Sequence, residues 1–137
     1  MTTPPLIEHI EHDAGYHEVI FLADSRPAVD AHMAVVKTLL QDAIASDEIV
    51  TVHLVINLTQ IKNVPPFAYL TKSGRKILQQ FAKNRDKLHL RGVFLAKHNE
   101  MSILSLAENF IKLLPVDATI KPFEDRHAAI AWLLKDA

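Results

Sequence analysis

The feature that most limits the fold of this chain is a regular alternation of strand-like and helix-like segments after an N-terminal hairpin. Two stretches with alternating polarity, residues 6–12 and 16–23, flank a turn at Ala14-Gly15. After them, segments with a helical spacing of apolar residues alternate with short apolar runs of strand character. The sequence predicts further strands at residues 51–58, 88–96 and 119–123 and helices at residues 27–47, 67–81, 99–114 and 125–135.

Single residues mark the ends of several predicted helices. Pro27 suits a first helical turn, Asn99 is a favourable N-cap, and Pro115 ends the helix before it. Strands and helices that alternate in this way require parallel strands with right-handed crossovers. The 137 residues match the length of one domain and suffice for a buried core. We therefore expect a single α/β domain over residues 1–137, with a mixed five-strand sheet, an N-terminal hairpin and four helices.

The composition excludes several classes of function. The chain has 15 Lys and Arg residues against 16 Asp and Glu, and a net charge of −1 creates no field that favours nucleic acid or an acidic membrane. It has no cysteine, which removes disulfides, thiolate nucleophiles and the strong zinc motifs. The N-terminus lacks a basic segment followed by an apolar stretch, and no apolar run is long enough to cross a bilayer. We expect a soluble cytoplasmic protein with no cofactor, no nucleic-acid partner and no transmembrane segment.

The two faces of the predicted sheet differ in polarity. On strands 51–58 and 88–96 one face is apolar throughout, which predicts that the four helices lie mainly on that face. The other face is a candidate surface, and its Val55, Val93 and Leu95 are together too apolar to remain in water. We expect a second subunit, a terminal segment or a ligand to cover them, and we favour a homodimer. The residues of this second face are His53, Val55, His89, Arg91, Val93 and Leu95.

Two motifs within this pattern point to a known family. The segment HLVINLTQIKNV and the ending FEDRHAAIAWL, together with four βα units after a hairpin, resemble the SpoIIAA-like group, the STAS domains and their CRAL-TRIO-related relatives. The resemblance covers nearly the whole chain. It implies a right-handed βα superhelix with an antiparallel hairpin strand, and a role in binding or regulation instead of catalysis.

The resemblance also implies where a phosphorylation switch would lie. Anti-sigma-factor antagonists of the STAS type carry Asp-Ser-Ser-Gly at the start of the helix after this strand, and a kinase partner phosphorylates a serine there. In this chain residues 65–68 are Pro-Pro-Phe-Ala, and Thr71 and Ser73 lie later in the helix. The phosphoacceptor is therefore missing, and the chain is closer to STAS-like or lipid-binding-like members without an assigned activity.

The corner that stands in place of this switch is rigid and apolar. Pro65 and Pro66 fix two φ angles and supply no N–H group. Phe67 has the spacing of a core residue, whereas Val64, Pro66 and Tyr69 lie off that line and are expected to form an exposed edge with one hydroxyl group. We name Val64, Pro65, Pro66, Phe67 and Tyr69 the lip, and we predict that it contacts a protein partner or borders the mouth of an apolar pocket.

The histidines raise two further hypotheses. His9 and Glu11 on one strand face could meet His17 across the hairpin as metal ligands, but a solvated polar edge is the more common arrangement, and we predict no metal site. His53 and His89 share the second face with Arg91. Because no acid or nucleophile accompanies them in the sequence pattern, we assign no catalytic residue.

Three functions follow from these patterns. The first is a non-enzymatic STAS-like domain for regulation or protein interaction that lacks the phosphoacceptor serine. The second is a carrier of a small apolar or lipid ligand, as the CRAL-TRIO relationship implies. The third is an enzyme of unknown reaction, which is supported only by the histidines and the arginine of the second face. The aromatic residues that favour the second function are Phe67, Tyr69, Phe81 and Phe110.

Overall fold

A computed structural model describes residues 4–135 and contains the strands and helices that the sequence predicts. The strands are β1 (Ile7–His12), β2 (Tyr16–Phe21), β3 (Val50–Asn57), β4 (Leu88–Leu95) and β5 (Asp117–Phe123). The helices are α1 (Arg26–Ile44), α2 (Phe67–Gln79), α3 (Met101–Ile111) and α4 (Arg126–Leu133), with short 3₁₀ helices η1 (Ala82–Asn84) and η2 (His98–Glu100). Within the described residues, no helix has the length and the apolar character needed to cross a membrane.

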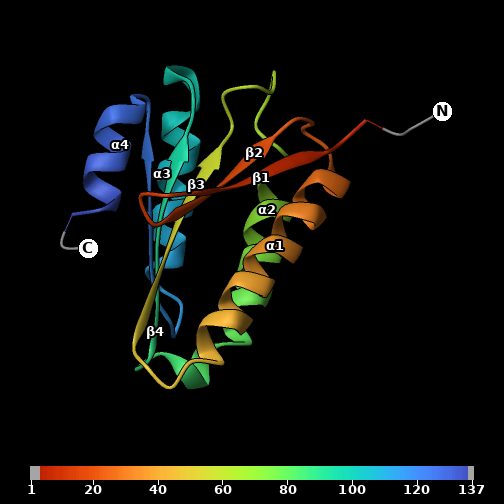
Figure 1. The fold of residues 1–137 in the computed structure, drawn as a ribbon. Coiled ribbons are helices and arrows are strands. Elements are labelled where there is room, and N and C mark those ends of the chain that lie inside the picture. Colours follow the sequence, from red (N-terminus) through yellow and green to blue (C-terminus); the bar gives the residue numbers. More distant parts are fainter. Residues whose placement is uncertain (1–3, 136–137) are drawn as a thin grey trace.

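The five strands form one mixed sheet in the sequential order β1-β2-β3-β4-β5 (Figure 1). β1 pairs with β2 in antiparallel orientation, and the remaining neighbours pair in parallel. Gly15 closes the hairpin with a φ of 99°, a backbone conformation that side-chain-bearing residues rarely adopt. This topology confirms the predicted α/β fold with its N-terminal hairpin.

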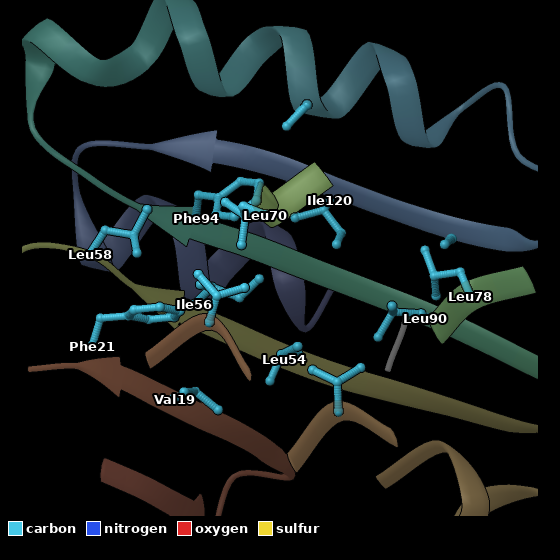
Figure 2. Close-up of a cluster of buried hydrophobic side chains, with 14 of the residues drawn as sticks. Val19, Phe21, Leu54, Ile56, Leu58, Leu70, Leu78, Leu90, Phe94 and Ile120 are labelled. Atoms are coloured by element: carbon cyan, nitrogen blue, oxygen red, sulfur yellow. The ribbon is translucent and has the colours of Figure 1, made fainter. Parts of the chain in front are cut away.

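Helices α1, α2 and α3 cover one face of the sheet, as the polarity of the strands predicts. Val29 of α1, Leu70 of α2 and Leu104 of α3 join Leu54 and Phe94 of the sheet in the main core cluster. Figure 2 shows strand side chains of this cluster meeting side chains from α2. Full burial of one such side chain stabilises the fold by about 1.5–3 kcal/mol.

Helix α4 covers the second face of the sheet, opposite the other three helices (Figure 1). Ala129 and Leu133 of α4 pack with Val55, Val93 and Leu95, whose exposed fractions are 0%, 0% and 2%. The apolar part of the second face is therefore covered by a terminal segment of the same chain. These three side chains therefore do not require the second subunit that a homodimer would supply.

The predicted start signal agrees with the structure at α1 but not at α3. The hydroxyl of Ser25 accepts a hydrogen bond from the N–H of Ala28, and Pro27 lies in the first turn of α1, as predicted. Asn99 was expected to cap α3 but lies inside η2. The buried Glu100 accounts for the difference, because its carboxylate accepts the backbone N–H of Lys97 at 3.3 Å and so starts the helical segment earlier.

Candidate functional site

The lip lies at the start of α2, and its residues differ in exposure. Pro65 is buried, Pro66 is exposed, and Val64, Phe67 and Tyr69 are half-buried. Phe67 packs against the main core, as its spacing predicts, and Tyr69 packs there as well. The lip is therefore mostly a packed corner that exposes Pro66.

Tyr69 links α2 to α1 through its ring and its hydroxyl. The hydroxyl donates a hydrogen bond to the carboxylate of Asp30, and this bond raises the pKa of Tyr69. The guanidinium carbon of Arg26 lies 5.1 Å from the centre of the Tyr69 ring. The hydroxyl group that the sequence analysis assigned to recognition is thus engaged within the chain.

The structure brings the polar residues of the second face together, as strand parity predicts. His53 is paired in register with Arg91, and His89 is paired with Thr51 on one side and Asp117 on the other. No acid was expected near this group, and that expectation is wrong, because β5 begins at Asp117 and not at residue 119. The carboxylate of Asp117 accepts a hydrogen bond from the imidazole of His89.

Arg91 acts as an anchor for α4. Its guanidinium donates hydrogen bonds of 2.7 and 3.2 Å to the carbonyl oxygen of Trp132, and its central carbon lies 3.9 Å from the Trp132 ring. Burial, assisted by the charge of Arg91, lowers the pKa of His53. The cation of this group is therefore committed to holding α4.

A buried carboxylate that the sequence analysis did not single out lies at the other end of α4. Glu18 of β2 is 1% exposed and accepts hydrogen bonds from Arg126 at 3.0 Å, Asn57 at 2.9 Å and His12 at 2.8 Å. Burial alone would raise the pKa of Glu18, but the bonds from Arg126, Asn57 and His12 outweigh it and hold the pKa below its usual value. This network ties α4 to the sheet, so its role is structural.

An apolar cavity of about 60 Å³ lies between α1, α2, α3 and the sheet. Its walls are apolar apart from His32, Thr71 and Arg75. The hydroxyl of Thr71 already donates to the carbonyl oxygens of its own helix at Phe67 and Ala68. The strand residues of its wall, which Figure 2 labels, are Leu54, Ile56, Leu90, Phe94 and Ile120.

His32 is the one buried polar residue of this cavity. Its side chain is 2% exposed, and its Nδ1 atom has no hydrogen-bond partner among the described residues. Burial lowers its pKa from 6.5 to about 4, so the imidazole is neutral at pH 7. The signal for this site was present in the sequence, because His32 stands three residues after Val29 and four before Val36, on the inward face of α1.

The cavity reaches the surface between α2 and α3. Arg75, which is exposed, lines it from α2, and Phe110 lines it from α3. The guanidinium carbon of Arg75 lies 6.0 Å from the centre of the Phe110 ring. Phe110 belongs to the aromatic set that the sequence analysis associated with an apolar ligand. Arg75 and Phe110 therefore mark the edge of the cavity that lies nearest the surface.

The hairpin histidines come together as the metal hypothesis required. His9 Nε2 lies 3.1 Å from His17 Nδ1, and Glu11 is paired in register with His17. Burial and the neighbouring His9 lower the pKa of His17, and Glu11 opposes them. Across residues 4–135, no group of three or more His, Cys, Asp or Glu side chains is arranged to hold a metal ion.

The chain shows no significant match to any protein-family model, curated protein or solved structure.

Proposed function

We propose that this protein is a non-enzymatic binding domain that takes up a small apolar ligand in the cavity between α1, α2, α3 and the sheet. The observation that carries the proposal is the cavity itself, which has apolar walls and an edge at the surface. Natural cores leave few voids larger than a water molecule, because each one forfeits packing contacts. A void of this kind that reaches the surface is therefore a candidate binding site.

The size of the cavity favours a small molecule over a lipid. One water needs about 10–15 Å³ of such space, and the cavity offers about 60 Å³. This corresponds to roughly four to six non-hydrogen atoms, which is far less than an acyl chain requires. Of the ligands that the sequence analysis left open, the small apolar one is the better match.

The polar groups at the cavity favour binding over catalysis, and the strand order supports a STAS-like relationship. The polar groups nearest the cavity are a hydroxyl bonded to its own helix and a neutral imidazole, so no activated nucleophile faces the ligand. The sequential strand order, with α1, α2 and α3 on one face, supports the βα superhelix of STAS and CRAL-TRIO-related domains.

Protein interaction is the second candidate function. Leu106 of α3 and Leu113 just after it are 60% and 83% exposed, which is unusual for leucines on one short segment. A partner protein or a second copy of the chain would remove them from water. Sedimentation of the purified protein with and without the changes Leu106→Gln and Leu113→Gln tests self-association at this segment.

Titration with methylcyclopentane, which has six non-hydrogen atoms, tests the binding proposal. We expect backbone ¹⁵N–¹H signals of cavity residues to shift in a saturable manner. Ala107, which is buried and lines the cavity from α3, is changed to Leu to fill the space, and the shifts should vanish. The matched control is Ala131→Leu at an exposed position of α4. Absence of saturable shifts in the unaltered protein would overturn the proposal.

A further inference from the structure

We propose that the groove between α1 and α2 docks an acidic amphipathic helix of a partner protein. The two helices lie side by side on one face of the sheet (Figure 1), and side chains of both line a groove of about 750 Å³. The inference goes beyond the apolar cavity, because none of the basic side chains that carry it lines that cavity.

The groove concentrates positive charge in a chain that is nearly neutral. Four cations line it, two from each helix, namely Arg26, Lys37, Lys72 and Lys76, and Asp30 is the single acidic residue of its wall. The wall thus has four positive charges against one negative charge, whereas the whole chain has a net charge of −1. Among residues 4–135, none of the four cations forms an ion pair. The groove therefore attracts an anionic partner.

Contacts within the wall leave this charge uncompensated. The carboxylate of Asp30 is engaged, because it accepts the hydrogen bond from the Tyr69 hydroxyl. The guanidinium carbon of Arg26 lies 5.1 Å from the centre of the same ring, which holds Arg26 at this end of the groove. Lys72 and Lys76 stand four residues apart on α2, where like charges are neighbours and destabilise a helix. Carboxylates of a partner would relieve this repulsion.

The cations are spread along the groove instead of meeting at one point. Arg26 and Lys37 are 11 residues apart on α1, which is about 16 Å at the helical rise of 1.5 Å per residue. A single phosphate or carboxylate group contacts only part of this length. A helix of three turns spans all of it and can display acidic side chains along it. The spacing therefore favours an acidic segment over a small anion.

Apolar residues of the same wall favour a segment with one apolar side. Met33 and Ala34 lie in sequence between Arg26 and Lys37, and Ile77 lines the groove from α2. Met33 and Ile77 are half-buried, so they form a floor and do not project from the surface. An amphipathic helix places its apolar stripe on such a floor and its carboxylates toward the cations.

A membrane and a second copy of the chain match the groove less well. Binding to a membrane surface needs large apolar side chains that reach into lipid. None of the large exposed apolar residues of the described chain lines the groove, these being Leu22, Ile44, Ile49, Leu106 and Leu113. A second copy would have to offer an acidic helix. No described helix has more than two acidic residues, and the one with two, α1, also carries Arg26 and Lys37.

Binding of a designed peptide to the full chain tests the inference. The probe is a capped peptide of three helical turns, in which leucines recur at intervals of three and four residues and glutamate fills nearly all other positions. Its titration into ¹⁵N-labelled protein should give saturable shifts at groove residues such as Ala34 and Ala68. Binding should weaken at least tenfold between about 0.1 M and 1 M salt, because the Debye length falls from about 10 Å to about 3 Å.

Charge reversal in the groove provides the matched comparison. Lys72→Glu combined with Lys76→Glu should raise the dissociation constant of the probe at least tenfold, because the groove then repels its carboxylates. The control, Lys87→Glu combined with Lys121→Glu, makes the same change of net charge at exposed positions outside the groove. The control should leave the dissociation constant within about twofold of its original value. Equal weakening by the two double variants would overturn the inference.

Further outcomes distinguish the other occupants and need no loss of the fold. A peptide of the same residues with leucines on all sides should bind at least tenfold more weakly, and equal binding would show attraction to charge alone. Absence of saturable shifts with the probe would also overturn the inference. So would binding to phosphatidylserine vesicles, or dimers in sedimentation, that the groove variant abolishes. The groove variant should still bind methylcyclopentane, so failure here leaves the proposed function separately testable.

Discussion

The buried carboxylate of Glu18 and the exposed guanidinium of Arg126 form an ion pair that joins β2 to α4 across 108 residues of sequence, with one N–O distance of 3.0 Å. At the other end of α4, Arg91 binds the carbonyl oxygen and the ring of Trp132. Helix α4 is thus attached near both ends by an arginine, and its Ala129 and Leu133 supply the apolar contact with the sheet.

Removal of Arg126 should destabilise the protein because it leaves the Glu18 carboxylate buried without its cation. We expect Arg126→Leu to lower the free energy of unfolding in urea by about 1–3 kcal/mol, since the bonds from His12 and Asn57 remain. The control is Lys83→Leu, at an exposed position. A double variant with Glu18→Leu should recover part of the loss. Equal stability of Arg126→Leu and the control would contradict the role of the pair.

The stability of the protein should fall between pH 6.5 and pH 4 because of His32. Its pKa is lowered from 6.5 to about 4, so in this range the unfolded chain binds a proton that the folded chain does not. Stability therefore decreases as the pH decreases, with a slope approaching 1.4 kcal/mol per pH unit for one proton. His32→Leu should flatten the urea-unfolding profile over this range. A parallel profile in the variant would show that His32 is not held neutral.

The contribution of Glu18 should appear at lower pH. Its pKa is lowered from 4.5, so the stability it provides is complete above that value and is lost as the pH falls through its folded pKa. His17 and His53, whose pKa values are also lowered, contribute equally to the unaltered protein and to His32→Leu. The two proteins should therefore lose stability in parallel below pH 4.

Weakening the Arg91 contact should loosen the C-terminal end of α4. Arg91→Lys keeps the charge but loses the planar stacking on Trp132 and one of the two hydrogen bonds, and we expect a loss of about 1 kcal/mol. Trp132 is the single tryptophan of the chain, so its fluorescence reports this end of α4 directly. Lys135→Met serves as the control. An emission spectrum unchanged from that of the unaltered protein would argue against the anchor.

Two glycines should respond to alanine in opposite directions. A Cβ atom on Gly92 would lie 3.2 Å from the carbonyl oxygen of Leu54 and 3.3 Å from Ile120 Cγ1, so Gly92→Ala should cost about 1–3 kcal/mol. On Gly74 the nearest atom would be Met33 Cε at 3.7 Å. Gly74→Ala should therefore gain up to about 1 kcal/mol from helix propensity. The melting temperatures of both variants test this prediction, and changes of the same sign would refute it.

The fold was largely predictable because periodicity reports burial directly. The alternation of Leu54 and Ile56 against His53 placed β3 with its apolar side toward α1, and the helical spacing of Val29 and Val36 placed α1. The ends of elements were harder. β5 begins at Asp117, ahead of the expected residue 119, because parallel pairing with His89 extends the strand beyond its apolar part.

The candidate site was harder to predict, because burial depends on which distant segments meet. From the sequence, Glu18 would be assigned to the surface, because the arginine that neutralises its charge, Arg126, comes from α4. The cover over Val55 likewise comes from the far end of the chain, which local patterns do not report. His32 lay on a visible inward line, yet an apolar cavity beside it is a property of three packed helices.

The position of α4 last among the described elements has a consequence for synthesis of the protein. Strands β3 and β4 leave the ribosome before α4, so Val55, Val93 and Leu95 lack their cover from Ala129 and Leu133 until α4 has emerged. Glu18 is without its arginine during the same interval. One face of the nascent sheet therefore stays apolar and uncovered until residues 126–133 have been synthesised.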